Sequence, residues 1–347
     1  MASGKVARRA VGSEISALLD STEIAALIGE IDASGDARGR TGYGARALVG
    51  ACLVKALYGL PTWTRVAALI ADHAGLQAAL GGAPSVWACY RFTTKLRLYS
   101  ETLADCLDRI AASLQVELPG IGQDVAIDSS ALPAFANGQR HVTKDGPERR
   151  RYSDPDASWG HRSAVSTRGA GGYYGYKLHA AVCTTTGLPL AWRIETGRRQ
   201  DSLYAEPLLD ALTARGYRPE TCAMDKGYDH HAVHQACEKR GCHPIIPVRK
   251  NQATLDGRGR QLVLLPPAPG DPPTRRHPHI PRSSRRFDTL YKNRVAVERE
   301  FGRLKNDYGL LPLRVRGLER VQLHADITML ARLSQALIRA RAVPVAA

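Results

Sequence analysis

The sequence predicts a mixed α/β domain preceded by an all-helical domain. Residues 13–118 read as helical segments without any period-2 run, and from residue 121 short apolar strand segments alternate with helical ones. A chain of 347 residues has room for roughly two domains of about 150 residues each. We therefore expect a helical domain over 1–118 and an α/β domain over 119–340.

The chain carries a large positive charge. It contains 48 Lys plus Arg against 33 Asp plus Glu, which gives a net charge of +15. An excess of this size usually indicates a polyanionic partner, and nucleic acid is the leading candidate, with an ordinary basic protein as the alternative. The hydrophobic share of 44% is typical of globular proteins and excludes a disordered chain.

Cysteine usage and the N-terminus favour a cytoplasmic protein. The seven cysteines are odd in number and show no disulfide framework, so reduced thiols are expected. Residues 1–12 are followed by no apolar run of the signal-peptide kind, and nothing approaches 18 consecutive apolar residues. With nucleic acid as partner, this predicts a nucleoid-associated protein without a membrane span.

The helical region is expected to hold about five helices. Residues 45–60 are the clearest, since their composition suits a helix and Gly59 and Pro61 end it. A later helical segment carries the basic cluster Arg91, Lys95 and Arg97. Binding of DNA and dimerisation or packing are both open for this domain.

The second region gives the order strand, hairpin, helix, strand, helix, strand. The segments are 122–132, 173–197, 201–216, 221–229, 230–241 and 243–248. This order predicts an α/β arrangement with mixed strand pairing.

Two segments break this pattern. Residues 134–172 are polar and rich in Gly, Arg and Ser, which predicts a long loop. Residues 266–286 contain seven prolines and five arginines, which predicts an extended basic arm.

Two acids stand at the ends of predicted strands. Asp128 ends the strand of VAIDSS, and Asp225 ends the strand of CAMDKGYD, where Gly227 permits a sharp exit. An acid on an apolar strand loses solvation unless it is paired or binds a metal. Two such carboxylates in one sheet can converge on a divalent cation such as Mg²⁺, although each alone could be a turn or capping acid.

The helix expected at 288–306 supplies a third acid. On a continuous helix, Tyr291, Arg294, Glu298 and Lys305 share an arc of about 60°. This stripe suits a carboxylate that completes a metal site, with cations placed for phosphate, although surface ion pairs are the alternative.

An apolar stripe borders the polar one. Val297, Phe301 and Leu304 form it, and Glu300 falls on its other side from Glu298. Glu298 is therefore the acid expected at the site, and Glu300 the acid away from it.

These residues resemble the signature of bacterial insertion-sequence DDE transposases. The pattern Y-x₂-R-x₃-E-x₆-K is met by the four polar residues of the helix, and the segments around Asp128 and Asp225 are similar to the first and second acids of the family's triad. The resemblance spans about 15–335 and implies a ribonuclease H-like core. It implies Asp128, Asp225 and Glu298 as catalytic metal ligands for two Mg²⁺ ions, with Mn²⁺ as a substitute.

The same resemblance implies nicking of double-stranded DNA at element ends and strand transfer into target DNA, by a homodimer on DNA. Arg294 and Lys305 are expected to hold phosphates, and Tyr291 to stack on a base or sugar. Lys177 and His179 share one strand face and are further candidates for DNA contact, or make ordinary pairing on that face.

Other readings remain open. One is a ribonuclease H-like nuclease without strand transfer, and another is an inactive DNA-binding remnant. A zinc site from His230, His234 and Cys237 is conceivable, but no C-x₂-C pair accompanies it. The 73 residues from Asp225 to Glu298 are expected to hold one helix, one strand and the basic arm, without the large β-rich insertion of some relatives.

Overall fold

The computed structural model falls into two compact units, the first comprising residues up to Glu117 with 304–314 and 323 onward, the second 118–303 and 315–322. The structure describes residues 12–34, 42–138, 153–162, 169–248 and 278–342, the elements 253–255 and 261–263, and residues 270, 272 and 275. The first division lies one residue from the boundary expected at 118/119.

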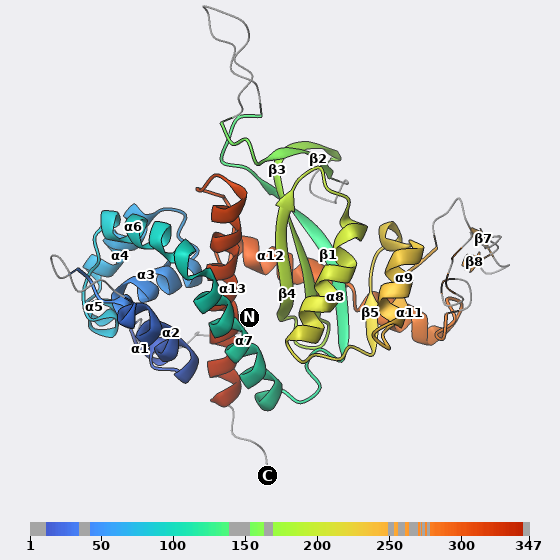
Figure 1. Ribbon diagram of the computed structural model, residues 1–347, viewed down its shortest axis with the longest axis horizontal. Helices are drawn as coiled ribbons and strands as arrows, with labels where there is room; N and C mark the ends of the chain where they lie inside the picture. The colour runs from blue at the N-terminus through green and yellow to red at the C-terminus, as the bar shows by residue number, and fades with distance from the viewer. Residues whose placement is uncertain are drawn as a thin grey trace, which may run out of the picture. The chain divides into compact units, whose positions relative to one another are not determined.

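The first unit is built from helices (Figure 1). In chain order, they are α1 (Ser13–Leu19), α2 (Thr22–Ala33), α3 (Ala45–Leu57), α4 (Trp63–Asp72), α5 (Ala74–Leu80), α6 (Val86–Leu96), the short η1 (Arg97–Tyr99) and α7 (Ser100–Glu117). No strand occurs among the described residues of 12–117. Helix α3 lies at the centre, because nine of its residues are buried, and Gly59 follows it with a φ of +60°.

The C-terminal helix α13 (Leu318–Arg341) joins this unit over most of its length, contrary to the expectation of an uninterrupted domain over 119–340. Leu330, Leu333 and Leu337 are buried. The guanidinium group of Arg341 lies 2.8 Å from the carboxylate of Glu23. Burial of this apolar face, which chain order does not reveal, decides the grouping.

The second unit contains a mixed sheet (Figure 1). Its strands are β1 (Asp124–Pro133), β2 (Ser158–Arg162), β3 (Gly171–Cys183), β4 (Pro189–Thr196), β5 (Thr221–Ala223) and β6 (His243–Ile245). Their order is β2-β3-β1-β5-β6, with β4 paired to β3. Strand β3 runs antiparallel to its three neighbours, while β5 runs parallel to β1 and β6, so the predicted mixed pairing is confirmed.

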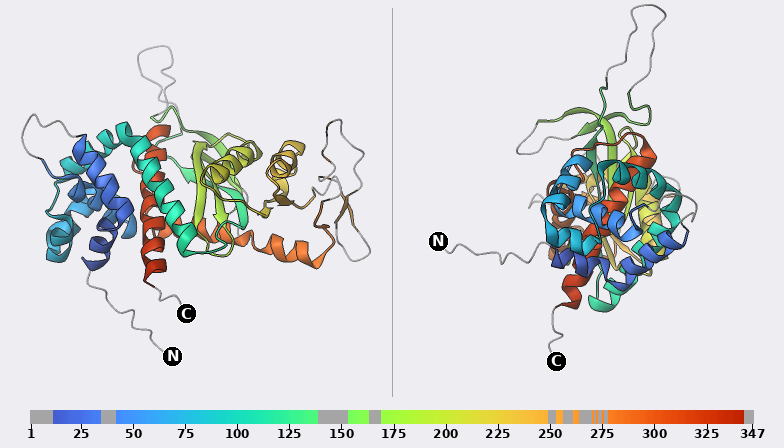
Figure 2. Two further views of the ribbon diagram at one scale, coloured as in Figure 1. Left: turned by 60° about the horizontal axis from the view of Figure 1, so that its bottom comes forward. Right: turned by 90° about the vertical axis from the view of Figure 1, so that its left-hand side faces the viewer.

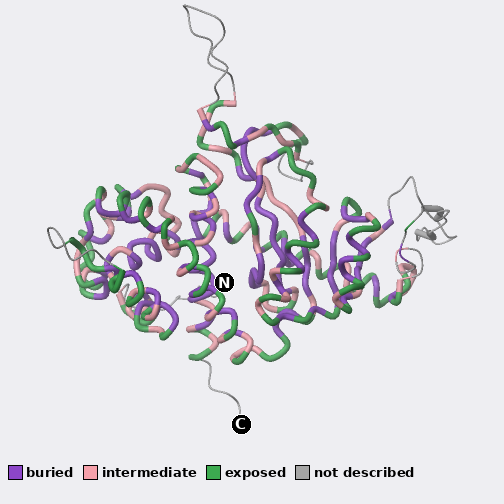
Figure 3. Tube along the Cα trace, in the orientation of Figure 1, coloured by how far each residue is buried: buried purple, intermediate pink, exposed green. Residues whose placement is uncertain are grey.

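Helices cover both faces of this sheet (Figure 2). The elements are η2 (Asp201–Tyr204), α8 (Ala205–Ala214), η3 (Lys226–Tyr228), α9 (His231–Glu238), α11 (Arg285–Lys292) and α12 (Val295–Asn306). Helices α8 and α9 lie on one face and α11 on the other. Strands β3, β4, β5 and β6 are consequently buried along most of their length (Figure 3), whereas β2 is not.

Three local predictions need correction. The segment 134–172, expected as a loop, contains β2. The interval between the second and third acids holds, besides α9 and β6, an antiparallel pair β7 (Ala253–Leu255) and β8 (Gln261–Val263). The single helix expected at 288–306 is two helices, α11 and α12. Short strands and a break between helices leave little trace in apolar periodicity.

The pairing directions decide where polar residues gather. Because β3 is antiparallel to both β1 and β4, and β5 is parallel to β1, the strands β1, β4 and β5 run the same way. Their carboxyl ends therefore meet at one edge of the sheet, which is the usual place for a site in an α/β sheet.

Candidate active site

Asp128 and Asp225 each lie two residues beyond a paired position of neighbouring parallel strands. Asp225 follows the end of β5, whereas Asp128 lies inside β1, which continues to Pro133, so the prediction that Asp128 ends its strand was wrong. The pairing of β1 with β5 matches Ala126 to Ala223, and each aspartate follows two residues later. Neighbouring strands lie about 4.8 Å apart, and residues at equal offsets point to the same face. The two carboxylates therefore leave the sheet side by side. Asp225 also caps η3, because its Oδ1 accepts a hydrogen bond of 2.7 Å from the amide of Gly227.

The surroundings of Asp128 disfavour its negative charge. Burial raises the pKa of its carboxyl to about 7, and the charges of Asp225 and Asp201 add to this. The amide of Ser129 and the guanidinium group of Arg294 oppose the rise in pKa. A carboxylate in such surroundings gains from any cation that reaches it.

Arg294 connects Asp128 to Glu298. One terminal nitrogen of its guanidinium group donates to Oδ2 of Asp128 at 2.8 Å, and the other donates to Oε1 of Glu298 at 2.5 Å. Since one guanidinium group spans both contacts, the two carboxylates lie within about 8 Å of each other. Two of the three expected acids, Asp128 and Glu298, are thus both bound by the guanidinium group of Arg294.

The break between α11 and α12 sets the position of Arg294. Asn293 and Arg294 lie between the two helices, so the helical angles expected for a continuous helix over 288–306 do not hold. Tyr291 remains close to Arg294, since the centre of the Tyr291 ring is 5.9 Å from the guanidinium carbon of Arg294. Tyr291 also stacks on Phe287 with ring centroids 6.2 Å apart. Arg294 therefore stays beside both Tyr291 and Glu298 despite the break between the helices.

The two acids of α12 lie in different surroundings, as their positions on either side of the apolar stripe predict. Val297 and Phe301 are buried, as predicted, and the side chain of Glu298 is 49% exposed. Glu300 is completely buried and pairs with Arg303 at 2.5 Å, away from Asp128. Glu298 is consequently the acid of this helix that faces the site.

Three of the residues expected to contact DNA, Lys305, Lys177 and His179, differ in how far they are exposed. Lys305 lies on α12, beyond Glu298 and partly exposed. The amino group of Lys177 lies 2.7 Å from a carboxylate oxygen of Asp201. His179 has no exposed surface and stacks on Tyr204 at 4.3 Å, so the expected direct contact of His179 with DNA does not fit its burial. The strand face that it shares with Lys177 is covered by η2 and α8.

Asp201 is the acid that the sequence argument missed. It begins η2, after the turn that follows β4, and its charge raises the pKa of both Asp128 and Tyr228. In the sequence it looks like an ordinary cap of the helix expected at 201–216. Its position beyond the end of a strand, like that of Asp225, is the one signal that could have revealed it.

The donor set suits a hard divalent cation, but the acids are not gathered as a metal cluster. Within the described ranges, no three His, Cys, Asp or Glu side chains come close enough together to hold a metal ion. Carboxylate oxygens are the ligands that Mg²⁺ prefers, and Arg294 occupies the space between two of them. The chemistry of these residues fits the ion, provided that Arg294 gives up its contacts.

Two other predicted features have structural roles. His234 is buried and lies 3.1 Å from Asp229, which leaves no zinc-like grouping with Cys237 in the described part of the chain. In the basic arm, Arg275 lies 3.3 Å from Asp229, and Arg282 donates to the carbonyl of Ile246 at 2.9 Å. These two arginines of the arm are therefore packed against the core, contrary to the expectation of an extended segment.

Comparison with known proteins identifies the family. A search of curated proteins gave no match. In the described residues, no helix is both long and apolar enough to cross a membrane. The family model described as the transposase DDE domain matches residues 120–333, which is well over half of the chain and includes Asp128, Asp225 and Glu298. The chain therefore belongs to the transposase DDE domain family, for which DNA is the partner.

Proposed function

We propose that this protein cuts DNA at the ends of an insertion sequence and joins the freed ends to target DNA, with Asp128, Asp225 and Glu298 as its catalytic acids. The observation that carries the proposal is the link from Asp128 through Arg294 to Glu298, made beside the strand end that bears Asp225. The strand order and the mixed pairing support a ribonuclease H-like core.

The three acids would hold two Mg²⁺ ions, or Mn²⁺ in their place. Such ions supply charge stabilisation at the reacting phosphate and a nucleophilic water or 3′-hydroxyl. Asp128 is the proposed bridging ligand, because it is the least exposed of the pair that Arg294 joins and lies beside Asp225. Because burial raises the pKa of Asp128, a cation would compete with a proton for this carboxyl.

Arg294 has two successive partners in this proposal. Without DNA it neutralises Asp128 and Glu298. When cations bind to these acids, its guanidinium group becomes available to a DNA phosphate, for which its planar fork is suited. Lys305 would hold a phosphate further along α12, and Tyr291 would stack on a sugar or base.

The helical unit is the proposed end-binding domain. Trp87 and Tyr90 on α6 are 73% and 47% exposed, and Arg91 and Lys95 lie on the same exposed side of this helix. Helix α6 contains no acidic residue. Aromatic and cationic side chains on one helix face suit DNA, whereas a symmetric contact between two copies would bring these cations together. A homodimer on DNA would then form through other surfaces.

A nuclease that cuts but does not join is the alternative. The decisive test incubates the full chain with Mg²⁺ and labelled DNA carrying the terminal repeats that flank its coding sequence, together with supercoiled target DNA. We expect nicks at the element ends and covalent products with the target. Nicks without joined products would support the nuclease, and end binding without nicks would support an inactive DNA-binding remnant.

A further inference from the structure

A buried carboxylate lies at the far end of the turn that Asp225 begins. The short helix η3 starts from Asp225 and ends at Asp229, and the amides of Tyr228 and Asp229 donate to the carbonyls of Asp225 and Lys226 at 3.0 and 3.3 Å. The side chain of Asp229 is only 2% exposed, so water does little to stabilise its charge. Because one closed turn contains both aspartates, a shift of Asp229 moves the second acid with it.

Side chains from two other segments hold Asp229. Its Oδ1 lies 3.1 Å from Nε2 of His234 on α9, and it accepts a hydrogen bond of 3.3 Å from Nε of Arg275, which belongs to the basic arm. His234 is completely buried, and the side chain of Arg275 is 12% exposed. One oxygen atom thus ties the turn of the second acid both to α9 and to the arm.

The charges around Asp229 favour its ionised form. Burial raises the pKa of its carboxyl, but the hydrogen bond from His234 and the charges of Arg275 and Arg282 lower it by more, so the pKa of Asp229 lies below its usual value. The buried side chain is therefore a carboxylate at neutral pH, paired to a guanidinium group. Buried ion pairs often add little net stability, so the role to test for this one is the placement of the segments that it joins.

The arm leads on to the helices that carry the third acid. The guanidinium group of Arg282 donates to the carbonyls of Arg275 and Ile246, each at 2.9 Å, which fastens the arm to the segment after β6. Two residues later, Ser284 caps α11. Helix α11 packs on β5 and β6, and α12, which carries Glu298, follows it. The carboxylate that holds the turn of the second acid is therefore also joined to the path that leads to the third.

From these contacts we infer that Asp229 is a positioning residue of the active site, whose link to Arg275 sets the placement of Asp225 relative to Glu298 at which the acids hold a cation. Since its carboxylate is buried against His234 and Arg275, Asp229 acts through other residues and not as a ligand itself. Loss of such a supporting residue typically weakens metal binding by about 10-fold to 100-fold. The inference rests on the proposed function, because it concerns the placement of two of its acids.

Arg275 gives the sharpest test, because charge and position predict opposite results. If only electrostatics counted, removal of a positive charge from the neighbourhood of Asp225 should strengthen the binding of a cation. If Arg275 holds the turn in place, its removal should weaken that binding. Arg275→Gln is therefore the diagnostic change, and Arg275→Lys, which restores the charge and a donor, should recover most of the affinity.

The measurement is the binding of Mn²⁺ to the full chain without DNA, followed by the electron paramagnetic resonance signal of the free ion, so that no cleavage is needed. Arg275→Gln and Asp229→Asn should each raise the dissociation constant of Mn²⁺ by about 10-fold. The double variant should bind no more weakly than the weaker single variant, because both changes break the same contact. Misfolded chains would instead lower the number of binding sites per chain and leave the dissociation constant of the folded chains unchanged.

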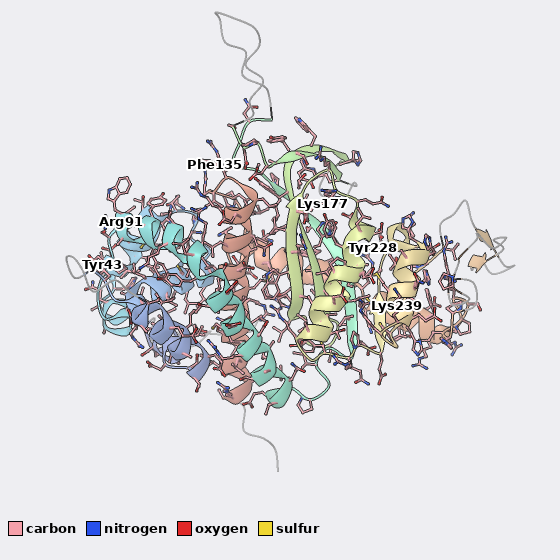
Figure 4. The ribbon with its side chains drawn as sticks, viewed as in Figure 1. Tyr43, Arg91, Phe135, Lys177, Tyr228 and Lys239 are labelled. Carbon is pink, nitrogen blue, oxygen red and sulfur yellow. The ribbon has the colours of Figure 1, made fainter. Side chains whose placement is uncertain are left out.

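Arg240→Gln is the matched control. Arg240 pairs with Asp210 and Glu206 of α8, and it lies just beyond the end of α9 that is remote from the turn. Figure 4 labels the neighbouring Lys239 and, in the turn itself, Tyr228. This change removes the same charge as Arg275→Gln but none of the contacts described above. The dissociation constant of Mn²⁺ should therefore stay within about 2-fold of the wild-type value.

Unchanged or tighter binding of Mn²⁺ by Arg275→Gln would overturn the inference, as would an equal loss of affinity in Arg240→Gln. Asp225→Asn tells this failure apart from failure of the proposed function. If Asp225→Asn loses nicking and Mn²⁺ affinity while Arg275→Gln binds the ion like the wild type, only the positioning role falls. If Asp225→Asn nicks and binds Mn²⁺ like the wild type, the assignment of the acids falls first, and the inference falls with it.

Discussion

The guanidinium group of Arg294 binds the carboxylate of Asp128, which lies 166 positions earlier in the chain. The sequence predicted both residues at the site, but as a metal ligand and a phosphate contact respectively. It could not predict their pairing, because that contact depends on the break between α11 and α12. Where a cation-binding acid lies buried, a neighbouring arginine is the natural partner in the absence of the cation.

The environment of His179 predicts a loss of stability in acid. Burial lowers the pKa of its ring to about 4, against the attraction of Asp201 and together with the repulsion of Lys177 and Arg193. Between about pH 6.5 and pH 4 the unfolded chain binds a proton that the folded chain does not, so the free energy of unfolding should fall as the pH falls, by about 3 kcal/mol from this group.

The measurement is the urea midpoint across this range of pH. His179→Phe preserves the stacking on Tyr204 and carries no proton, so its free energy of unfolding should depend less steeply on pH than that of the wild type. An equally steep dependence in both proteins would show that other groups cause the loss.

At the scale of elements, the buried carboxylate of Asp154 ties β3 to the segment before α13. It accepts a hydrogen bond of 2.8 Å from the hydroxyl of Tyr176 and one of 3.2 Å from the amide of Gly317. Asp154→Ala should lower the free energy of unfolding by about 3 kcal/mol, and Tyr176→Phe by about 1 kcal/mol, because the first change removes both contacts to a charged group. Denaturant unfolding checks this, and near-neutral effects of Asp154→Ala would contradict it.

The basic arm divides into packed and exposed arginines. Arg285 and Arg286 are exposed at the start of α11, while Arg282 donates to the carbonyls of Ile246 and Arg275. Neutralising the exposed pair should lower the salt slope of duplex binding by about 0.9 for each lost phosphate contact. Arg282→Ala should instead reduce thermal stability. Equal effects of all three on the slope, without loss of stability, would show that the whole arm lies on DNA.

Helix α6 gives a prediction for the recognition of element ends. Combined replacement of Trp87, Arg91 and Lys95 by Ala should weaken binding to end DNA by about 10-fold to 100-fold, because both stacking and phosphate contacts are lost. Arg109→Ala, which removes a cation of α7 paired to Glu30, serves as the control and should bind normally. Fluorescence anisotropy with end and scrambled duplexes measures both, and intact end preference in the triple variant would refute the assignment.

For the whole molecule, the sequence predicted the mixed sheet because strand alternation, hairpin signals and caps are local. The same patterns placed Asp225 correctly beyond the end of a strand, but they ended the first strand too early, since Asp128 lies inside β1. The C-terminal helix was assigned to the wrong unit, because burial against a distant part of the chain decides its place. Asp201 was overlooked because its role comes from neighbours on other strands. Long-range packing is the information that local patterns lack.

The central claim is that three acids from one sheet edge and α12 act together. The most direct measurement is nicking of labelled element ends in Mg²⁺ by Asp128→Asn, Asp225→Asn and Glu298→Gln, with binding measured in Ca²⁺. Each variant should lose nicking by at least about 1000-fold while still binding ends, because each loses one charged oxygen donor. Glu206→Gln, an exposed acid of α8, should nick like the wild type. Full nicking by any of the three acid variants would contradict the account.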